Sequence, residues 1–134
     1  LRTKILSKYN GIDINDYEVF TQVQLKTGIG DEYFVADMVL VKRKTDEFEN
    51  VVLDLDNAVV VETKLNYGTN LTTPQSNGLT KVQSSSNTFD IRSISKESSG
   101  GYMISNTKSL KINDFIKVWS DGTGNVIDDV ISLK

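Results

Sequence analysis

Short runs of β-branched residues, separated by Gly, Asn, Asp and Ser, recur along most of this 134-residue chain, which contains a single Pro. Branched side chains favour extended backbone, whereas the small polar residues between them favour turns. In the clearest run, residues 18–26, one side of an extended chain would carry Val19, Thr21, Val23 and Leu25. A helix is the alternative interpretation of that run. The pattern as a whole predicts a strand-rich fold with one core.

The other elements are predicted from apolar runs bounded by turn residues. Residues 32–44 should form a strand antiparallel to the first, after the glycine-containing turn at residues 28–31. The run at residues 58–61 is apolar without alternation, which predicts a strand covered on both faces. The remaining predicted elements are two strands at 51–55 and 58–65 around a turn at Asp56-Asn57, a helix with Thr73 as N-cap and Pro74 as first residue, a short strand at 101–105, and a hairpin of 114–119 and 125–133 around residues 121–124.

These elements describe one domain over residues 1–134. We expect an α/β or α+β fold, with a mixed central β-sheet, flanking helices and a C-terminal β-hairpin. No apolar run approaches the roughly 20 residues that cross a bilayer, so we expect no membrane span. Because the first residue is Leu1, we expect the sequence to be a piece of a longer protein.

The absence of both Cys and His limits the chemistry of the chain. Disulfide scaffolds, thiolate metal sites, imidazole zinc sites and Ser-His-Asp triads are all excluded. Any catalysis must therefore use carboxylates, Lys, Tyr, Ser or Thr.

Charge is distributed unevenly along the chain. The net charge of −3 argues against a protein that binds nucleic acid through a diffuse basic surface. However, residues 31–62 carry nine acidic and three basic side chains, whereas residues 81–120 carry six basic and three acidic ones. Basic residues of the later segment, with an aromatic side chain for stacking, are candidates for contacts with a nucleic acid. They are Arg92, Lys96, Lys108, Lys111 and Lys117, with Tyr102 or Trp119. Scattered exposed lysines around a core Trp are the alternative.

Three charged residues that interrupt or end apolar strands form the strongest candidate site. Asp37 stands within FVADMVLV, where an unpaired carboxylate is costly to bury. Glu62 and Lys64 are two residues apart, so they project from one face of a strand. On neighbouring strands, the two carboxylates would bind a hard divalent cation, and Lys64 would stabilise the charge that develops on a phosphodiester. A solvent-exposed strand face with ordinary surface charges is the alternative.

The order of these residues resembles the PD-(D/E)XK nuclease superfamily, through VAD at Asp37, VVVETK with Glu62 and Lys64, and LTTPQ at Gln75. More narrowly, residues 18–80 are similar to restriction-endonuclease-like toxin domains at the C-terminal ends of large bacterial secreted proteins used in contact-dependent competition.

The resemblance implies a fold, a cofactor and roles for individual residues. It implies a restriction-endonuclease-like fold in which Asp37 and Glu62 bind Mg²⁺ or Mn²⁺, with Zn²⁺ as a further possibility. It makes Lys64 the catalytic lysine and places Gln75 near the active site. In that superfamily a further acidic residue often comes from an N-terminal helix. The match here is Glu18, which lies at the start of a predicted strand.

The resemblance also implies a biological setting. It implies an endonuclease toxin that cleaves DNA or tRNA, is secreted or delivered from the surface of a bacterium, acts in the cytoplasm of a target cell, and is neutralised by a cognate immunity protein. The alternative is a non-enzymatic, β-rich binding module of a surface or phage structural protein. That alternative predicts that Asp37 and Glu62 lie far apart or on different faces of the sheet.

Overall fold

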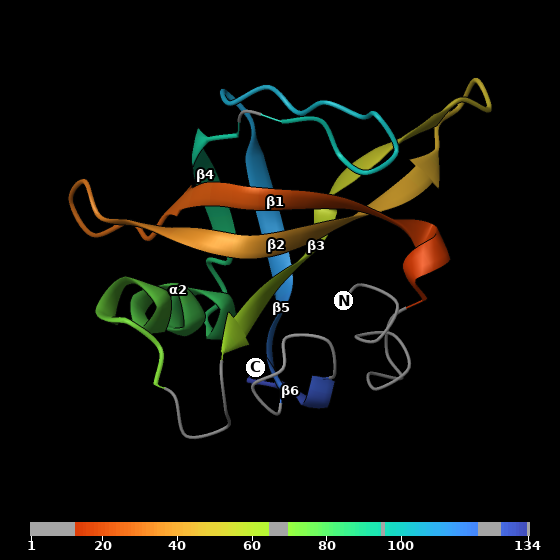
Figure 1. Ribbon diagram of the computed structural model, residues 1–134. Coiled ribbons are helices and arrows are strands. Elements are labelled where there is room, and N and C mark those ends of the chain that lie inside the picture. Colours follow the sequence, from red (N-terminus) through yellow and green to blue (C-terminus); the bar gives the residue numbers. More distant parts are fainter. Residues whose placement is uncertain (1–12, 65–69, 95, 121–126, 134) are drawn as a thin grey trace.

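One mixed sheet with an α-helix packed against it makes up the described part of the chain (Figure 1). The computed structural model describes residues 13–64, 70–94, 96–120 and 127–133. In chain order its elements are η1 (Ile14–Asp16), β1 (Tyr17–Lys26), β2 (Tyr33–Thr45), β3 (Val51–Lys64), α2 (Thr73–Gln83), β4 (Thr88–Ser93), β5 (Ser109–Ser120) and β6 (Ile127–Ser132). The predicted mixed sheet of the α+β class is confirmed, whereas α2 is the one α-helix found in these residues.

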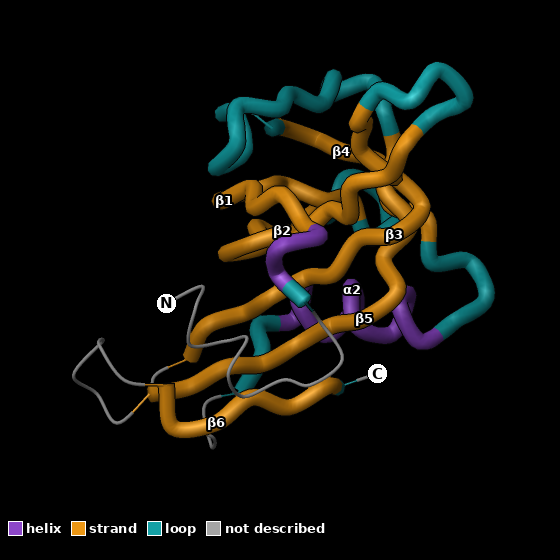
Figure 2. Tube along the Cα trace, turned by 90° about the vertical axis from the view of Figure 1, so that its right-hand side faces the viewer, coloured by secondary structure: helices purple, strands orange, loops and turns teal. Residues whose placement is uncertain are grey.

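The sheet closes on itself. Strands β1, β2 and β3 form an antiparallel meander, and hydrogen-bonded neighbours follow the order β3-β2-β1-β4-β5-β6. In addition, β3 pairs in parallel with β5, which joins the two sides of the sheet. Figure 1 shows β5 passing behind β1 and β2, and Figure 2 shows it between β3 and β6. The sequence did not predict this closure.

Two clusters of buried side chains lie on opposite sides of β2 and β3. The larger cluster includes Val82 of α2, and the ring of Phe34 packs directly on that helix at Gly78. A Cβ atom at position 78 would lie 2.5 Å from Phe34 Cε1, so this close approach requires glycine. The smaller cluster consists of Val19, Met38, Leu40, Val59, Val61, Ile116 and Val118. Because β3 contributes to both clusters, the prediction that residues 58–61 are covered on both faces is confirmed.

Strands β1 and β2 change face at one shared position. Gln22 has a φ of 54°, and the residue opposite it in the antiparallel register is Asp37. On either side of Gln22, Val19 and Val23 lie in different buried clusters although they are an even number of residues apart. The predicted strand at 18–26 is therefore confirmed, but its predicted continuous face is wrong. The same irregularity carries Asp37 out of the regular strand ladder.

The predicted turn at Asp56-Asn57 is wrong, because β3 runs through both residues as one strand. The register of β3 with β2 shifts there. Val41 pairs with Ala58 and the next residue, Lys42, pairs with Asp54, so residues 55–57 form a β-bulge. The side chain of Asn57 donates a hydrogen bond to Asp54 at 2.6 Å. Residues that commonly form turns thus form a bulge inside a long strand.

The remaining predictions had mixed outcomes. Helix α2 begins one residue earlier than predicted, with Thr72 rather than Thr73 as N-cap. The predicted strand at residues 101–105 is wrong; this segment follows a turn in which Ser98 accepts a hydrogen bond from the backbone N–H of Tyr102. Strands β5 and β6 are antiparallel neighbours, but residues 121–126 lie outside the described residues, so the C-terminal hairpin stays a prediction.

Across the described ranges, no helix is long and apolar enough to cross a bilayer, in line with the sequence.

Candidate active site

Four of the five residues singled out in the sequence come together where β2, β3 and α2 meet. The side chains of Ala58 and Val60 enter the larger core cluster, and Glu62 follows them at even spacing on the same side of β3. From β2, the Oδ2 atom of Asp37 accepts a hydrogen bond from the backbone N–H of Thr63 at 2.8 Å. This bond holds the Asp37 carboxylate at the end of the β2–β3 ladder, next to Glu62.

Gln75 links the two charged residues of β3. Its Nε2 atom donates to Glu62 Oε2 at 3.1 Å, and its Oε1 atom accepts from Lys64 Nζ at 2.8 Å. The same Oε1 atom accepts from the backbone N–H of Thr72 at 3.0 Å, while the Gln75 backbone N–H donates to Thr72 Oγ1 at 3.3 Å. These reciprocal bonds are a capping box, which fixes Gln75 at the first turn of α2. The capping-box spacing T-x-x-Q at residues 72–75 was the sequence signal for Thr72 that the prediction missed.

Glu62 is a buried carboxyl group with an incomplete set of partners. Its side chain is 0% exposed, and its Oε1 atom has no hydrogen-bond partner. Burial, followed by the charge of Asp37 and a hydrogen bond with it, raises the pKa of Glu62 to about 9, although Lys64 opposes the shift. A pKa raised in this way favours the protonated form of the Glu62 carboxyl at neutral pH.

The donor set fits a hard divalent cation. Among the described residues no group of three or more acidic side chains is placed to share a metal, so Asp37 and Glu62 would be its two protein carboxylates. Mg²⁺ commonly binds one or two carboxylates and completes its coordination with water and substrate phosphate. Zn²⁺ usually takes nitrogen or sulfur ligands, and the chain has no His or Cys. The buried, unpartnered oxygen of Glu62 is the atom that such a cation would satisfy.

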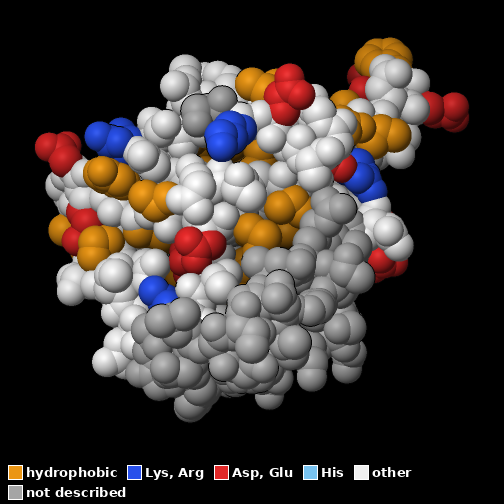
Figure 3. All heavy atoms as spheres, in the orientation of Figure 1, with side chains coloured by type: hydrophobic (Ala, Val, Ile, Leu, Met, Phe, Trp, Pro, Cys, Tyr) orange, Lys and Arg blue, Asp and Glu red, His pale blue; other side chains and the backbone are white. Residues whose placement is uncertain are grey.

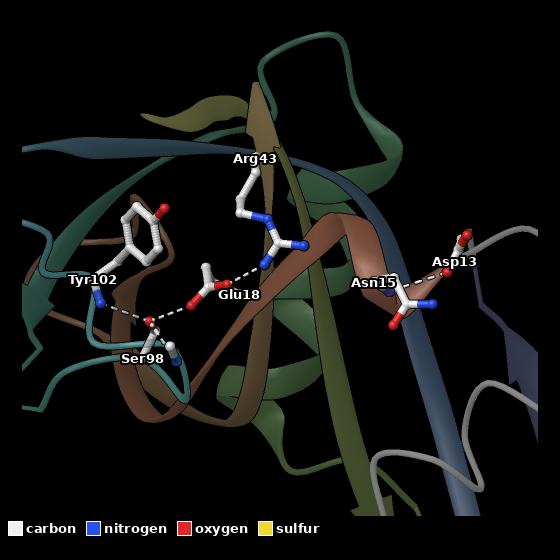
Figure 4. A network of polar contacts seen from close by, with 7 residues as sticks. Asp13, Asn15, Glu18, Arg43, Ser98 and Tyr102 are labelled. Atoms are coloured by element: carbon white, nitrogen blue, oxygen red, sulfur yellow. Dashed lines mark hydrogen bonds and ion pairs between the residues drawn. The ribbon is translucent and has the colours of Figure 1, made fainter. Parts of the chain in front are cut away.

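Glu18 does not join this cluster; Figure 4 shows its carboxylate between Arg43 and Ser98. It is 3% exposed, forms an ion pair with Arg43, and accepts a hydrogen bond from Ser98 Oγ at 2.7 Å. Its register partner on β2 is Val41, four residues along the strand from Asp37. Glu18 lies on a strand rather than an N-terminal helix, and it anchors the turn after β4 rather than the candidate site.

The basic residues that the sequence offered for contacts with a nucleic acid do not share one surface. Lys117 is buried, and Lys108 and Tyr102 line a separate apolar pocket beside the bulged part of β3. The side chain of Trp119 lies outside the described part of the structure. Arg92 lies elsewhere, in a hollow where its guanidinium group stacks on the ring of Tyr33.

No family model, no curated protein and no solved structure matches this chain. The site can therefore be interpreted only from the chemistry and geometry of its own residues. The resemblance to PD-(D/E)XK nucleases rests on the order of the motif residues alone.

Proposed function

We propose that this chain is a metal-dependent endonuclease that hydrolyses phosphodiester bonds of DNA or tRNA. The observation that carries the proposal is the unpartnered Oε1 atom of buried Glu62, next to the carboxylate of Asp37. Buried polar atoms without partners are rare in folded proteins, and two adjacent carboxyl groups disfavour each other's charge. A divalent cation would relieve both costs. Asp37 and Glu62 would hold Mg²⁺ or Mn²⁺, with Zn²⁺ a less suitable ion.

Residues around the cation would bind the phosphate and orient the carboxylates. The bound cation would polarise the phosphate and neutralise part of its charge. Lys64, held by Gln75 Oε1, would donate hydrogen bonds to a phosphate oxygen as negative charge develops on it. Thr63 and Gln75 would orient Asp37 and Glu62 through the hydrogen bonds already in place.

Two further observations support this proposal over a binding module. Asp37 and Glu62 are in contact, whereas the binding-module alternative predicted that they would lie apart. In addition, the chain passes from β3 through α2 and β4 to β5, which is parallel to β3. We include a restriction-endonuclease-like arrangement of these elements in the proposal.

The biological part of the proposal rests on the sequence resemblance. It describes a toxin domain that a bacterium secretes or delivers from its surface, that acts in the cytoplasm of a target cell, and that a cognate immunity protein neutralises in the producer. Increased toxicity on expression without a neighbouring immunity gene supports this part. Equal growth with and without that gene contradicts it.

Cleavage assays test the nuclease proposal. The purified chain is incubated with plasmid DNA and with total tRNA in Mg²⁺, Mn²⁺, Zn²⁺ or EDTA, beside the variants Asp37→Ala and Lys64→Ala. The matched controls Asp56→Ala and Lys42→Ala each remove an exposed charge of the same sign outside the cluster. We expect cleavage by the wild type and both controls, loss in the two site variants, and none in EDTA. If the wild type cuts neither substrate with any ion, or if the site variants cut as well as the controls, the proposal is wrong.

A further inference from the structure

A second polar feature lies at the start of β2. Here a hollow of about 520 Å³ is lined by Lys26, Asp31, Tyr33, Ile91 and Arg92. These residues come from the facing ends of β1 and β2, the turn between them, and β4. In Figure 3, hydrophobic side chains lie beside a Lys or Arg side chain over the end of the β1–β2 pair that Figure 1 draws at the left.

The guanidinium group of Arg92 is held as a flat platform in this hollow. Its central carbon lies 4.0 Å from the centroid of the Tyr33 ring, and its Nη1 atom donates a hydrogen bond to Gln24 Oε1. Both of these partners are uncharged, so neither neutralises the positive charge of the guanidinium. An arginine plane that is fixed from below and at one edge can stack a nucleobase on its other face.

The hollow and Asp37 of the candidate site lie along the same strand, β2. Along β2, Phe34 and Ala36 are buried in the core, whereas Tyr33, Val35 and Asp37 are partly or fully accessible. Tyr33 and Asp37 are four residues apart along β2, a separation of about 13 Å. That distance corresponds to roughly two to four nucleotides of one strand.

From this geometry we infer that the Tyr33–Arg92 hollow is a nucleobase subsite for a single-stranded nucleic acid whose backbone continues toward Asp37. The inference rests on the proposed nuclease function and specifies its substrate class. A base stacks on Arg92, and the adjacent phosphate contacts Lys26 at the rim. The carboxylate of Asp31 repels phosphate, which favours the base rather than the backbone inside the hollow. Only unpaired bases offer a free face for this stacking, so single strands and loops are preferred over duplexes.

Oligonucleotide binding tests the subsite separately from cleavage. A short fluorescently labelled single strand is titrated in EDTA with the full chain carrying Lys64→Ala, which prevents cleavage, and binding is followed by anisotropy. Arg92→Lys is added because it keeps the charge but removes the planar surface, and Tyr33→Leu because it removes the ring beneath. The control is Lys44→Gln, which removes an exposed charge at the opposite end of β2.

We expect Arg92→Lys and Tyr33→Leu each to raise the Kd about 5- to 100-fold, as loss of one stacked base predicts. Lys44→Gln should change the Kd by less than about twofold, consistent with a weak exposed charge. A duplex of the same sequence should bind more weakly and should not respond to Arg92→Lys. If Arg92→Lys binds as its parent does, or if the duplex responds equally, the subsite is wrong.

The two proposals fail in different ways. Cleavage that needs Asp37 and Lys64, together with binding that ignores Arg92, overturns the subsite alone. Binding that depends on Arg92, without cleavage of any nucleic acid, overturns the nuclease function and keeps the subsite. Thermal unfolding of each variant confirms that these exposed substitutions leave the fold intact.

Discussion

Two buried glutamates, Glu18 and Glu62, have opposite electrostatic surroundings. Glu18 on β1 faces the guanidinium of Arg43 and the hydroxyl of Ser98, so its negative charge is balanced and its oxygens have donors. Glu62 on β3 has one oxygen bonded to the neutral amide of Gln75, no partner on the other oxygen, and a second carboxyl group beside it. The resemblance implies that both are active-site acids, but of the two only Glu62 lies beside a second carboxyl group and has an oxygen without a partner.

The difference between them is that the chain itself balances the charge of Glu18 but not that of Glu62. A buried charge that is paired and hydrogen-bonded needs nothing further from outside the chain. A buried carboxyl group that lacks a donor and faces another acid has a raised pKa, and it gains most from a cation.

The largest expected effect is the loss of cleavage in Glu62→Gln. This substitution keeps the shape of the side chain but removes the charge needed to hold a cation, so we expect the cleavage rate to fall at least about 100-fold. The matched variant Glu18→Gln should keep the rate within about threefold, because Glu18 lies outside the cluster. Initial rates on the preferred nucleic acid with saturating Mn²⁺ measure both. Equal losses in the two variants would remove the distinction between them.

The second prediction concerns stability against pH in EDTA. The folded-state pKa of Glu62, about 9, exceeds its ordinary value of 4.5, so within this range the folded chain holds a proton that the unfolded chain has released. The resulting stabilisation is complete below pH 4.5 and is lost as the pH rises toward 9, with a slope of at most about 1.4 kcal/mol per pH unit.

Denaturant unfolding at several pH values measures this slope. Glu62→Gln should remove it and should be more stable than the wild type at alkaline pH, whereas Glu18→Gln should keep it. A wild-type stability that rises between pH 5 and 9, or a slope unchanged in Glu62→Gln, contradicts the assignment.

The third prediction is a loss of stability in Glu18→Ala. The substitution leaves Arg43 and Ser98 without their carboxylate partner, which should lower the free energy of unfolding by about 2 to 3 kcal/mol. Because the cluster at Glu62 is untouched, Mn²⁺ affinity should not change. Urea denaturation gives the first quantity and calorimetry the second, and altered Mn²⁺ affinity would place Glu18 back in the metal site.

The smallest expected effect is at Gly100, which lies against the Glu18 carboxylate. A Cβ atom at this position would overlap Glu18 Oε1, so Gly100→Ala should cost about 1 to 2 kcal/mol of stability through the displaced carboxylate. Ser99→Ala, at the exposed neighbouring position, is the control and should cost less than about 0.5 kcal/mol. Equal unfolding midpoints for the two variants would show that the turn does not press on Glu18.

The strands were predictable where local pattern determined them. The ranges of β1 and β2 and the double coverage of residues 58–61 followed from apolar runs and turn residues. The closure of the sheet was not predictable, because the β3–β5 pairing joins segments about fifty residues apart and leaves no local signal. The pattern at Asp56-Asn57 predicts a turn where the structure has a bulge, because the residues that favour turns also allow a bulge when the flanking strands keep their pairing.

The candidate site was predictable in part. Strand alternation and the motif order were enough to group Asp37, Glu62, Lys64 and Gln75, since all four lie in or beside adjacent elements. Glu18 was misplaced because a motif specifies an order of residues and not the sheet register that separates Glu18 from Asp37. The Tyr33–Arg92 pair was missed because Tyr33 lies on β2 and Arg92 on β4. These strands come close only because both pair with β1, and a single sequence does not reveal the β1–β4 pairing.

Calorimetric titration of the chain with Mn²⁺ near pH 7 tests most directly whether Glu62 and Asp37 form a cation site. Binding should displace about one proton, because the metal-free Glu62 carboxyl is protonated at that pH, and repeating the titration in buffers of different ionisation enthalpy counts it. We predict one site with this proton release, lost in both Asp37→Asn and Glu62→Gln and retained in Glu18→Gln. No Mn²⁺ binding to the wild type, or Mn²⁺ binding in Asp37→Asn and Glu62→Gln equal to that of the wild type, would contradict the cation site.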